Sequence, residues 1–284
     1  MIRTQSSAVI NFARRAFIRG MAPMGAARAR QLFREGLPEN FRPAFEFLFE
    51  QKLSAQDVRV VERVEVLRTA LAQGNKSFRV IGSDGNLLTR TSQFIAQYSS
   101  VTRGWGTFLY LCAKGFKATT ILELGSCVGI SGSYLASAPH CREFLSIERS
   151  PELAALARTH IQHICRDADV VNGTIDDVLP QVLAQFTQPI DLYYVDANHH
   201  YEPTLRYFEK AIPFLGQGAL VVFDDIHWSK PMWNAWQQLC AHQGFSHTID
   251  IGRFGLCVWQ GGHAQPRRHT LARYAGWVWS YVPR

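Results

Sequence analysis

The sequence predicts an α/β protein with a seven-stranded, mostly parallel sheet that ends in an antiparallel hairpin, preceded by an N-terminal helical extension. From residue 120 onward, short apolar runs alternate with segments whose apolar residues recur at helical spacing. Such alternation is typical of right-handed strand–helix–strand units with parallel strands. The last two apolar runs are separated only by Gly252-Arg253, which predicts a hairpin.

We divide the chain into the extension (1–90), an α/β domain (91–262) and a C-terminal tail (263–284). The extension begins with a basic arm, residues 1–34, which holds seven arginines and no acidic residue. The arm has several interpretations: contact with nucleic acid, an anionic lipid surface or an acidic partner, a transit peptide, or an amphipathic helix packed on its own domain.

Helical spacing within and just after the extension predicts four helices, over residues 8–34, 41–50, 55–73 and 91–117. We expect the first to break near residues 20–25 and the last near residues 103–106, because glycines occur there. The aromatic residues Trp105, Phe108 and Tyr110 could form a lid over a site or pack in the core, and the sequence leaves both readings open.

The α/β domain carries the regular part of the pattern. Strands are expected over 120–124, 143–147, 168–172, 190–195, 218–223, 245–251 and 254–260, and helices over 129–138, 151–164, 176–186, 202–215 and 230–242. No apolar run reaches the roughly 18 residues that span a bilayer, so we expect a soluble protein. The six cysteines show neither zinc nor disulfide spacing, which favours a reducing setting, so we expect a cytoplasmic location.

The run Thr120–Tyr134, TILELGSCVGISGSY, is the strongest candidate for a ligand-binding loop. An apolar strand ends at Gly125, and a second glycine, Gly129, precedes the next helix. Glycines let a backbone approach a ligand closely, and a helix N-terminus offers free N–H groups. The spacing differs from the GxGxxG of dinucleotide folds, and no lysine follows as in a phosphate loop.

Polar residues also follow the next strands. Glu148 ends the second strand, where a carboxylate could accept both hydroxyls of a ribose. Gly173-Thr174 follows the third strand and Asp196 the fourth. Since the carboxyl ends of parallel strands lie at one edge, these residues should surround one ligand.

With its E-x-G-x-x-x-G loop, the segment from Thr120 to Gln260 resembles a class I S-adenosylmethionine-dependent methyltransferase, Rossmann-like in fold, of the O-methyltransferase-like branch. Its D-x-N-H and FDDIHWS motifs are similar to those of a largely uncharacterised bacterial group. The resemblance implies S-adenosylmethionine as cofactor. The predicted cofactor-binding residues are Glu123, Gly125, Ser126, Gly129, Glu148, Gly173, Thr174 and Asp196.

The resemblance also suggests an acceptor site. In metal-dependent O-methyltransferases, an Asp after strand four and an Asp-Asp or Asp-Asn pair after strand five bind Mg²⁺; Asp196, Asp224 and Asp225 match these positions. Asp196, His199 and His227 are the catalytic candidates, with either histidine as the proton acceptor. In the alternative without a metal, Asp196 holds the cofactor, and Asp224 or Asp225 caps a helix.

The sequence therefore predicts an S-adenosylmethionine-dependent methyltransferase that O-methylates a small molecule, with Mg²⁺ and a homodimer as open possibilities. Two other classes remain. A nucleic-acid methyltransferase would use the arginine arm, but Asp196-Ala197-Asn198-His199 stands where an NPPY-type motif would be expected. A non-catalytic protein would keep only the fold and bind the cofactor.

Overall fold

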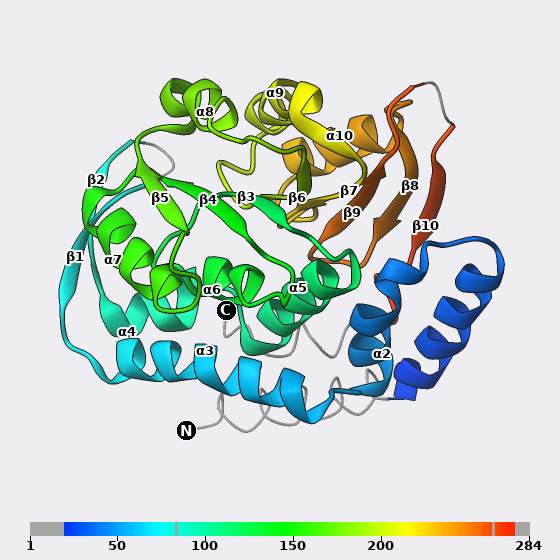
Figure 1. The fold of residues 1–284 in the computed structure, drawn as a ribbon, viewed down its shortest axis with the longest axis horizontal. Helices are drawn as coiled ribbons and strands as arrows, with labels where there is room; N and C mark the ends of the chain where they lie inside the picture. Colours follow the sequence, from blue (N-terminus) through cyan, green and yellow to red (C-terminus); the bar gives the residue numbers. More distant parts are fainter. Residues whose placement is uncertain (1–19, 83–84, 263–264, 276–284) are drawn as a thin grey trace, which may run out of the picture.

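The structure, a computed structural model, describes residues 20–82, 85–262 and 265–275. Its centre is an eight-stranded sheet with the strand order β10-β8-β9-β7-β6-β3-β4-β5 (Figure 1). Only β9 runs antiparallel to its neighbours β7 and β8. The strands are β3 (Thr120–Leu124), β4 (Glu143–Glu148), β5 (Asp169–Asn172), β6 (Ile190–Val195), β7 (Leu215–Phe223), β8 (Phe245–Asp250), β9 (Gly255–Trp259) and β10 (Arg267–Thr270).

The predicted α/β class is confirmed, and β8 and β9 form the predicted antiparallel hairpin, but the hairpin does not end the sheet and the count of seven strands is wrong. The eighth strand is β10, which comes from the predicted tail and pairs in parallel with β8. Its sequence, Arg-Arg-His-Thr, has no apolar run that would predict a strand. It forms because the edge of β8 offers unpaired backbone groups.

Helices cover both faces of the sheet (Figure 1). On one side lie α5 (Arg103–Gly115), α6 (Ile130–Ala136) and α7 (Pro151–Gln162); on the other lie α8 (Ile175–Leu183), α9 (Tyr201–Ala211) and α10 (Lys230–Cys240). Successive strand residues alternate between the faces. Thus Leu122 and Leu124 join the core under α8–α10, whereas Ile121 joins the core under α5–α7.

Within the described residues, the extension has helices where the sequence predicts them: a helix over residues 20–34, η1 (Glu39–Phe41), α2 (Arg42–Glu50) and α3 (Ala55–Gln73). The short helix α4 (Ser92–Phe94) and the π-helix η2 (Ile95–Ser99) follow it. Between α3 and α4, β1 (Ser77–Ile81) and β2 (Leu87–Thr91) form an antiparallel hairpin. The first helix does not break at Gly25; there, a side chain would collide with Phe49 and Tyr274, so glycine permits close packing.

The segment before β3, predicted as one helix with a break near residues 103–106, also differs from the prediction. Its break lies at residues 100–102, and α5 runs through Gly104 and Gly106. A Cβ on Gly106 would lie 2.4 Å from the ring of Tyr134, so this glycine brings α5 and α6 together. Trp105, Phe108 and Tyr110 are fully buried. They are core residues, and the lid reading is wrong.

The described part of the basic arm, residues 20–34, packs on its own domain. Ala26, Ala29 and Leu32 are buried, and Arg30 pairs with Glu50 at 3.1 Å. Residues 1–19 lie outside the described residues. Within the described ranges, no helix is both long and apolar enough to cross a membrane.

Candidate cofactor and acceptor site

The predicted site residues meet at the carboxyl edge of the parallel strands. The first residue after each of β3, β5, β6 and β7 donates its N–H to the end of a neighbouring strand, which fixes these loops relative to one another. These bonds run from Gly125, Gly173, Asp196 and Asp224 to the carbonyls of Ile147, Glu148, Leu124 and Val195, at 2.9, 3.1, 3.0 and 2.9 Å.

The glycine loop is tightly enclosed. Gly125 has φ +92°, and a Cβ there would lie 2.1 Å from the carbonyl oxygen of Asp196. Gly129 has φ +82°, and a Cβ there would lie 2.9 Å from the Cα of Ala157 on α7. Both positions require glycine for conformation and for close approach. The loop is thereby held against the end of β6 and against α7.

Glu123 lies beneath this loop, fully buried. Ser146 donates to its Oε2 at 2.9 Å, but Oε1 finds no hydrogen-bond partner among the described residues. Burial raises the pKa of Glu123 to about 8, and nearby Asp196 and Glu148 add to the rise. A buried carboxyl oxygen without a partner is costly unless a ligand or water completes it.

Glu148 lies beside the same loop and anchors it. Cys127 donates its N–H to Oε2 at 3.0 Å, and Ser150 donates its N–H to Oε1 at 2.8 Å. Burial raises the pKa of Glu148, while these backbone bonds oppose the rise. Each carboxylate oxygen can accept more than one hydrogen bond, so a ribose diol could still bind.

The other predicted cofactor residues have supporting positions. The hydroxyl of Ser126 lies 2.8 Å from that of Ser146, under the loop. Gly173 packs on Val178, where a Cβ would be 2.5 Å from a methyl carbon. Thr174 is exposed and donates to Asp177 at 2.6 Å at the start of α8. They line the same edge of the sheet as Glu148.

The unpartnered oxygen of Glu123, the glycines and Glu148 together fit S-adenosylmethionine. The buried oxygen suits its ammonium group, directly or through water. The glycines let the loop close against the end of β6 and against α7, which holds its backbone beside Glu123 and Glu148, and Glu148 suits the ribose.

Asp196 and His199 form a pair directly beside Gly125. His199 Nε2 lies 3.4 Å from Asp196 Oδ1. Burial opposes both charges, but each stabilises the other, so the pKa of Asp196 falls below its usual value and that of His199 rises to about 9. Asn198 and His199 have φ of +68° and +40°. Non-glycine residues rarely hold this conformation, and such strain clusters at functional sites.

Asp224 is fully buried, and hydrogen-bond donors surround both of its carboxylate oxygens. Its Oδ1 accepts from Arg253 Nε at 2.6 Å and from the N–H of Asp225 at 2.7 Å; its Oδ2 accepts from Arg253 Nη2 at 2.6 Å and from the Tyr194 hydroxyl at 2.9 Å. Burial raises the pKa of Asp224, and Arg253 opposes the rise. Because donors surround both oxygens, we take Asp224 to be ionised.

The predicted metal ligands are therefore neighbours but do not form an open metal site. Arg253 also lies 3.6 Å from Asp225 Oδ1, and the Tyr194 hydroxyl lies 3.1 Å from Asp196 Oδ2. Among the described residues, no three His, Cys, Asp or Glu side chains are arranged to hold a metal ion. These side chains, as arranged, do not fit Mg²⁺.

His227 belongs to a separate pair. Its Nε2 lies 3.0 Å from Asp250 Oδ2, and its ring stacks on Trp233 with centroids 4.7 Å apart. The next residue, Trp228, is 72% exposed. The structure thus does not bring His227 into the Asp196–His199 pair.

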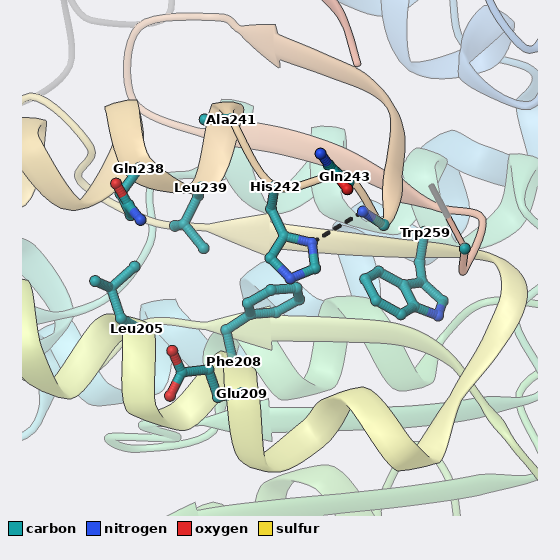
Figure 2. Close-up of a pocket in the computed structure, with 11 residues that line it drawn as sticks. Leu205, Phe208, Glu209, Gln238, Leu239, Ala241, His242, Gln243 and Trp259 are labelled. Atoms are coloured by element: carbon teal, nitrogen blue, oxygen red, sulfur yellow. Dashed lines mark hydrogen bonds between the residues drawn. The ribbon is translucent and has the colours of Figure 1, made fainter. Parts of the chain in front are cut away.

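A cavity of about 440 Å³ lies away from these residues. Figure 2 shows His242 above the ring of Phe208, with Trp259 beside them, between α9, α10 and the end of β9. Because β9 runs antiparallel to β7, Trp259 lies at the opposite edge of the sheet from Gly125. None of the predicted site residues lines this cavity.

Sequence reasoning missed Tyr194 and Arg253. Tyr194 stands inside an apolar strand run, so its hydroxyl gave no signal. Arg253 occupies a predicted hairpin turn, where an arginine normally indicates only a solvated position. No spacing connects it to Asp224, since their contact arises from sheet pairing.

Comparison with known proteins supports a methyltransferase fold. Residues 122–226 match the family model described as a methyltransferase domain. Two relatives named catechol O-methyltransferase, from Niastella koreensis and Mycobacterium tuberculosis, are 32% and 31% identical over 130 and 131 residues, or 45% of this chain. The match covers 58% and 57% of those proteins, so the chain spans less than two thirds of their length.

A crystal structure of an O-methyltransferase from Bacillus cereus in complex with SAH (S-adenosylhomocysteine) superimposes on this chain with a TM-score of 0.51 at 20% identity. The match covers 71% of this chain and 91% of that chain. The chain has the fold of a methyltransferase. The predicted resemblance is confirmed at this level, while the narrower bacterial group stays a prediction.

Proposed function

We propose that this chain is an S-adenosylmethionine-dependent methyltransferase that O-methylates a small molecule. The observation that carries the proposal is the combination of a glycine loop closed against Asp196 with Glu123 and Glu148 beside it. The names of the relatives and of the Bacillus cereus structure support it. The relatives' shared name favours an aromatic diol as the acceptor.

In this proposal the glycine loop, Glu123 and Glu148 hold the cofactor. When bound, it supplies a methyl group to the acceptor oxygen and keeps the electron pair of the broken carbon–sulfur bond. His199 accepts the acceptor's proton. Its Nε2 side is oriented by Asp196 Oδ1 at 3.4 Å, which leaves Nδ1 to take the proton.

The His227–Asp250 pair offers a second proton acceptor. We place His199 first, because Asp196 directly adjoins Gly125 in the cofactor loop. Trp228, exposed at the end of the same loop as Asp224, would contact an aromatic acceptor. A small-molecule acceptor also agrees with the position of the arginine arm, because its described residues, 20–34, pack on their own domain. A homodimer and a cytoplasmic location stay predictions.

Calorimetry with S-adenosylhomocysteine tests the cofactor site. Glu148→Ala should weaken binding by about ten- to a hundredfold, because hydrogen bonds to a charged group contribute roughly 1.5–3 kcal/mol. Glu152→Ala is the matched control, since Glu152 lies four residues further on and pairs with exposed Arg79. Release of S-adenosylhomocysteine in the presence of catechol tests the transfer. Absence of S-adenosylhomocysteine binding by the unaltered protein would contradict the proposal.

A further inference from the structure

Arg253 enters the acceptor site from the turn between β8 and β9. Its guanidinium binds both oxygens of Asp224 at 2.6 Å, in a fork geometry. The side chain of Asp224 is fully buried, and that of Arg253 is 17% exposed. Paired, hydrogen-bonded charges of this kind are costly to separate, because either partner left alone would be an uncompensated buried charge.

Each carboxylate of the predicted metal site already has a partner side chain within 3.6 Å. Arg253 serves Asp224 and lies 3.6 Å from Asp225, while His199 lies 3.4 Å from Asp196. Mg²⁺ needs carboxylate oxygens that are free to coordinate it at short distance in near-octahedral geometry. A metal ion could reach Asp224 only by displacing the guanidinium and the Tyr194 hydroxyl.

We propose that Arg253 is the resident cation of the acceptor site, in the place that the sequence assigns to a divalent metal, and that methyl transfer by this chain needs no metal. The inference rests on the proposed function, because it assumes that an acceptor oxygen binds here.

The contacts with Asp224 use Nε and Nη2 of Arg253 and leave Nη1 outside them. A guanidinium cannot be deprotonated in a protein and has more N–H donors than these two bonds use. The Arg253 side chain is 17% exposed, and Nη1 would donate to an acceptor with an oxygen next to the one that is methylated, as in an aromatic diol. Arg253 is thus a positioning residue: it fixes Asp224 and supplies positive charge beside the reacting oxygen.

Metal binding provides a test that does not depend on activity. Binding of Mn²⁺ is measured by electron paramagnetic resonance on the unaltered protein, on Arg253→Met and on Arg206→Met. Arg206→Met is the matched control, because Arg206 also forms a bidentate pair, with Asp176 at 2.9 and 3.0 Å, but on the surface. We expect no stoichiometric Mn²⁺ binding by the unaltered protein or by Arg206→Met. We expect a gain of at least about tenfold in affinity for Arg253→Met, because removing the cation leaves uncompensated carboxylates that can bind a metal.

Turnover adds a second readout. We expect the unaltered protein to keep its activity in EDTA and added guanidinium to restore part of the activity of Arg253→Ala. Stoichiometric Mn²⁺ binding by the unaltered protein, or loss of its turnover in EDTA, would overturn the inference; so would Arg253→Met binding no more Mn²⁺ than the control. If Arg253→Met does not fold, Arg253→Lys keeps the charge, and the measurements on the unaltered protein still test the claim. Failure of S-adenosylhomocysteine to bind would count against the proposed function, whereas the Mn²⁺ result concerns Arg253 alone.

Discussion

Replacement of Gly125 by alanine should separate the cost of backbone conformation from the cost of disturbing the site. Gly125 has φ +92°, and Gly218, in β7, has φ +85°. An L-residue in the left-handed region costs about 1–2 kcal/mol. A Cβ on Gly218 meets nothing within 4 Å, whereas one on Gly125 would lie 2.1 Å from the Asp196 carbonyl oxygen. Gly218→Ala is therefore the matched control for conformation alone.

The additional effect at Gly125 follows from this contact. Cβ atoms essentially never approach within 3.0 Å of such atoms, so the loop that carries Asp196 must retreat by 0.9 Å, from 2.1 to 3.0 Å. That movement strains the bond from the Asp196 N–H to Leu124, which contributes about 1 kcal/mol. We expect Gly218→Ala to lower the free energy of unfolding by about 1–2 kcal/mol, and Gly125→Ala by about 2–3 kcal/mol.

Two assays check this reasoning. Chemical denaturation gives the free energy of unfolding, and calorimetry gives the affinity for S-adenosylhomocysteine. Gly125→Ala should bind at least about tenfold more weakly than the unaltered protein, and turnover should fall by about a hundredfold, because a 1 Å displacement of positioned groups has that effect. Gly218→Ala should bind normally. Equal stability and equal affinity of the two variants would refute the role assigned to Gly125.

Three further predictions concern ionisation. Glu123 has a pKa of about 8 without ligand; if the cofactor's ammonium group restores its charge, binding at pH 7 should release about 0.9 proton. Calorimetry in buffers of different ionisation enthalpy measures this release, which Glu123→Gln should abolish. His199 has a pKa of about 9, so kcat/KM should rise about tenfold per pH unit toward pH 9 and then level off, and an unchanged profile in His199→Gln would exclude it as the base. Burial opposes the charge of Asp57, but Lys114, at 2.6 Å, and other donors lower the pKa of Asp57. The ionised Asp57 therefore stabilises the fold above its unfolded pKa, and this stabilisation is lost as pH falls through the lower folded pKa. Asp57→Ala should lower the free energy of unfolding by about 3 kcal/mol near neutral pH. If denaturation experiments show the same loss at every pH, the stabilising role of the Asp57 charge is contradicted.

Residues close together in the sequence determined most of the fold and the candidate cofactor loop. The alternation of strand and helix patterns predicted β3 to β9 and their order along the chain, because each unit depends on local apolar spacing. The loop from Gly125 to Gly129 was identifiable for the same reason. Its glycines are required by local conformation and by close approach, and both leave a mark in the sequence.

Local patterns were insufficient where tertiary contacts override them. The expected break near Gly25 is absent, because Phe49 and Tyr274 pack against the helix there. β10 lacks any apolar run and forms only because the edge of β8 is available. Trp105 was consistent with either a lid or the core, and its burial depends on contacts with distant segments such as Phe254.

The sequence alone determined the fold class, the candidate cofactor loop and the carboxylates that end neighbouring strands. Only the tertiary structure decided which side chains pair with those carboxylates. Asp196, Asp224 and Asp225 have the residue types of a metal site, but pairing of β7 with β9 brings Arg253 against Asp224 at 2.6 Å. Electrostatic partners depend on distance in space, and a pair separated by 29 positions leaves no periodic signal in the sequence.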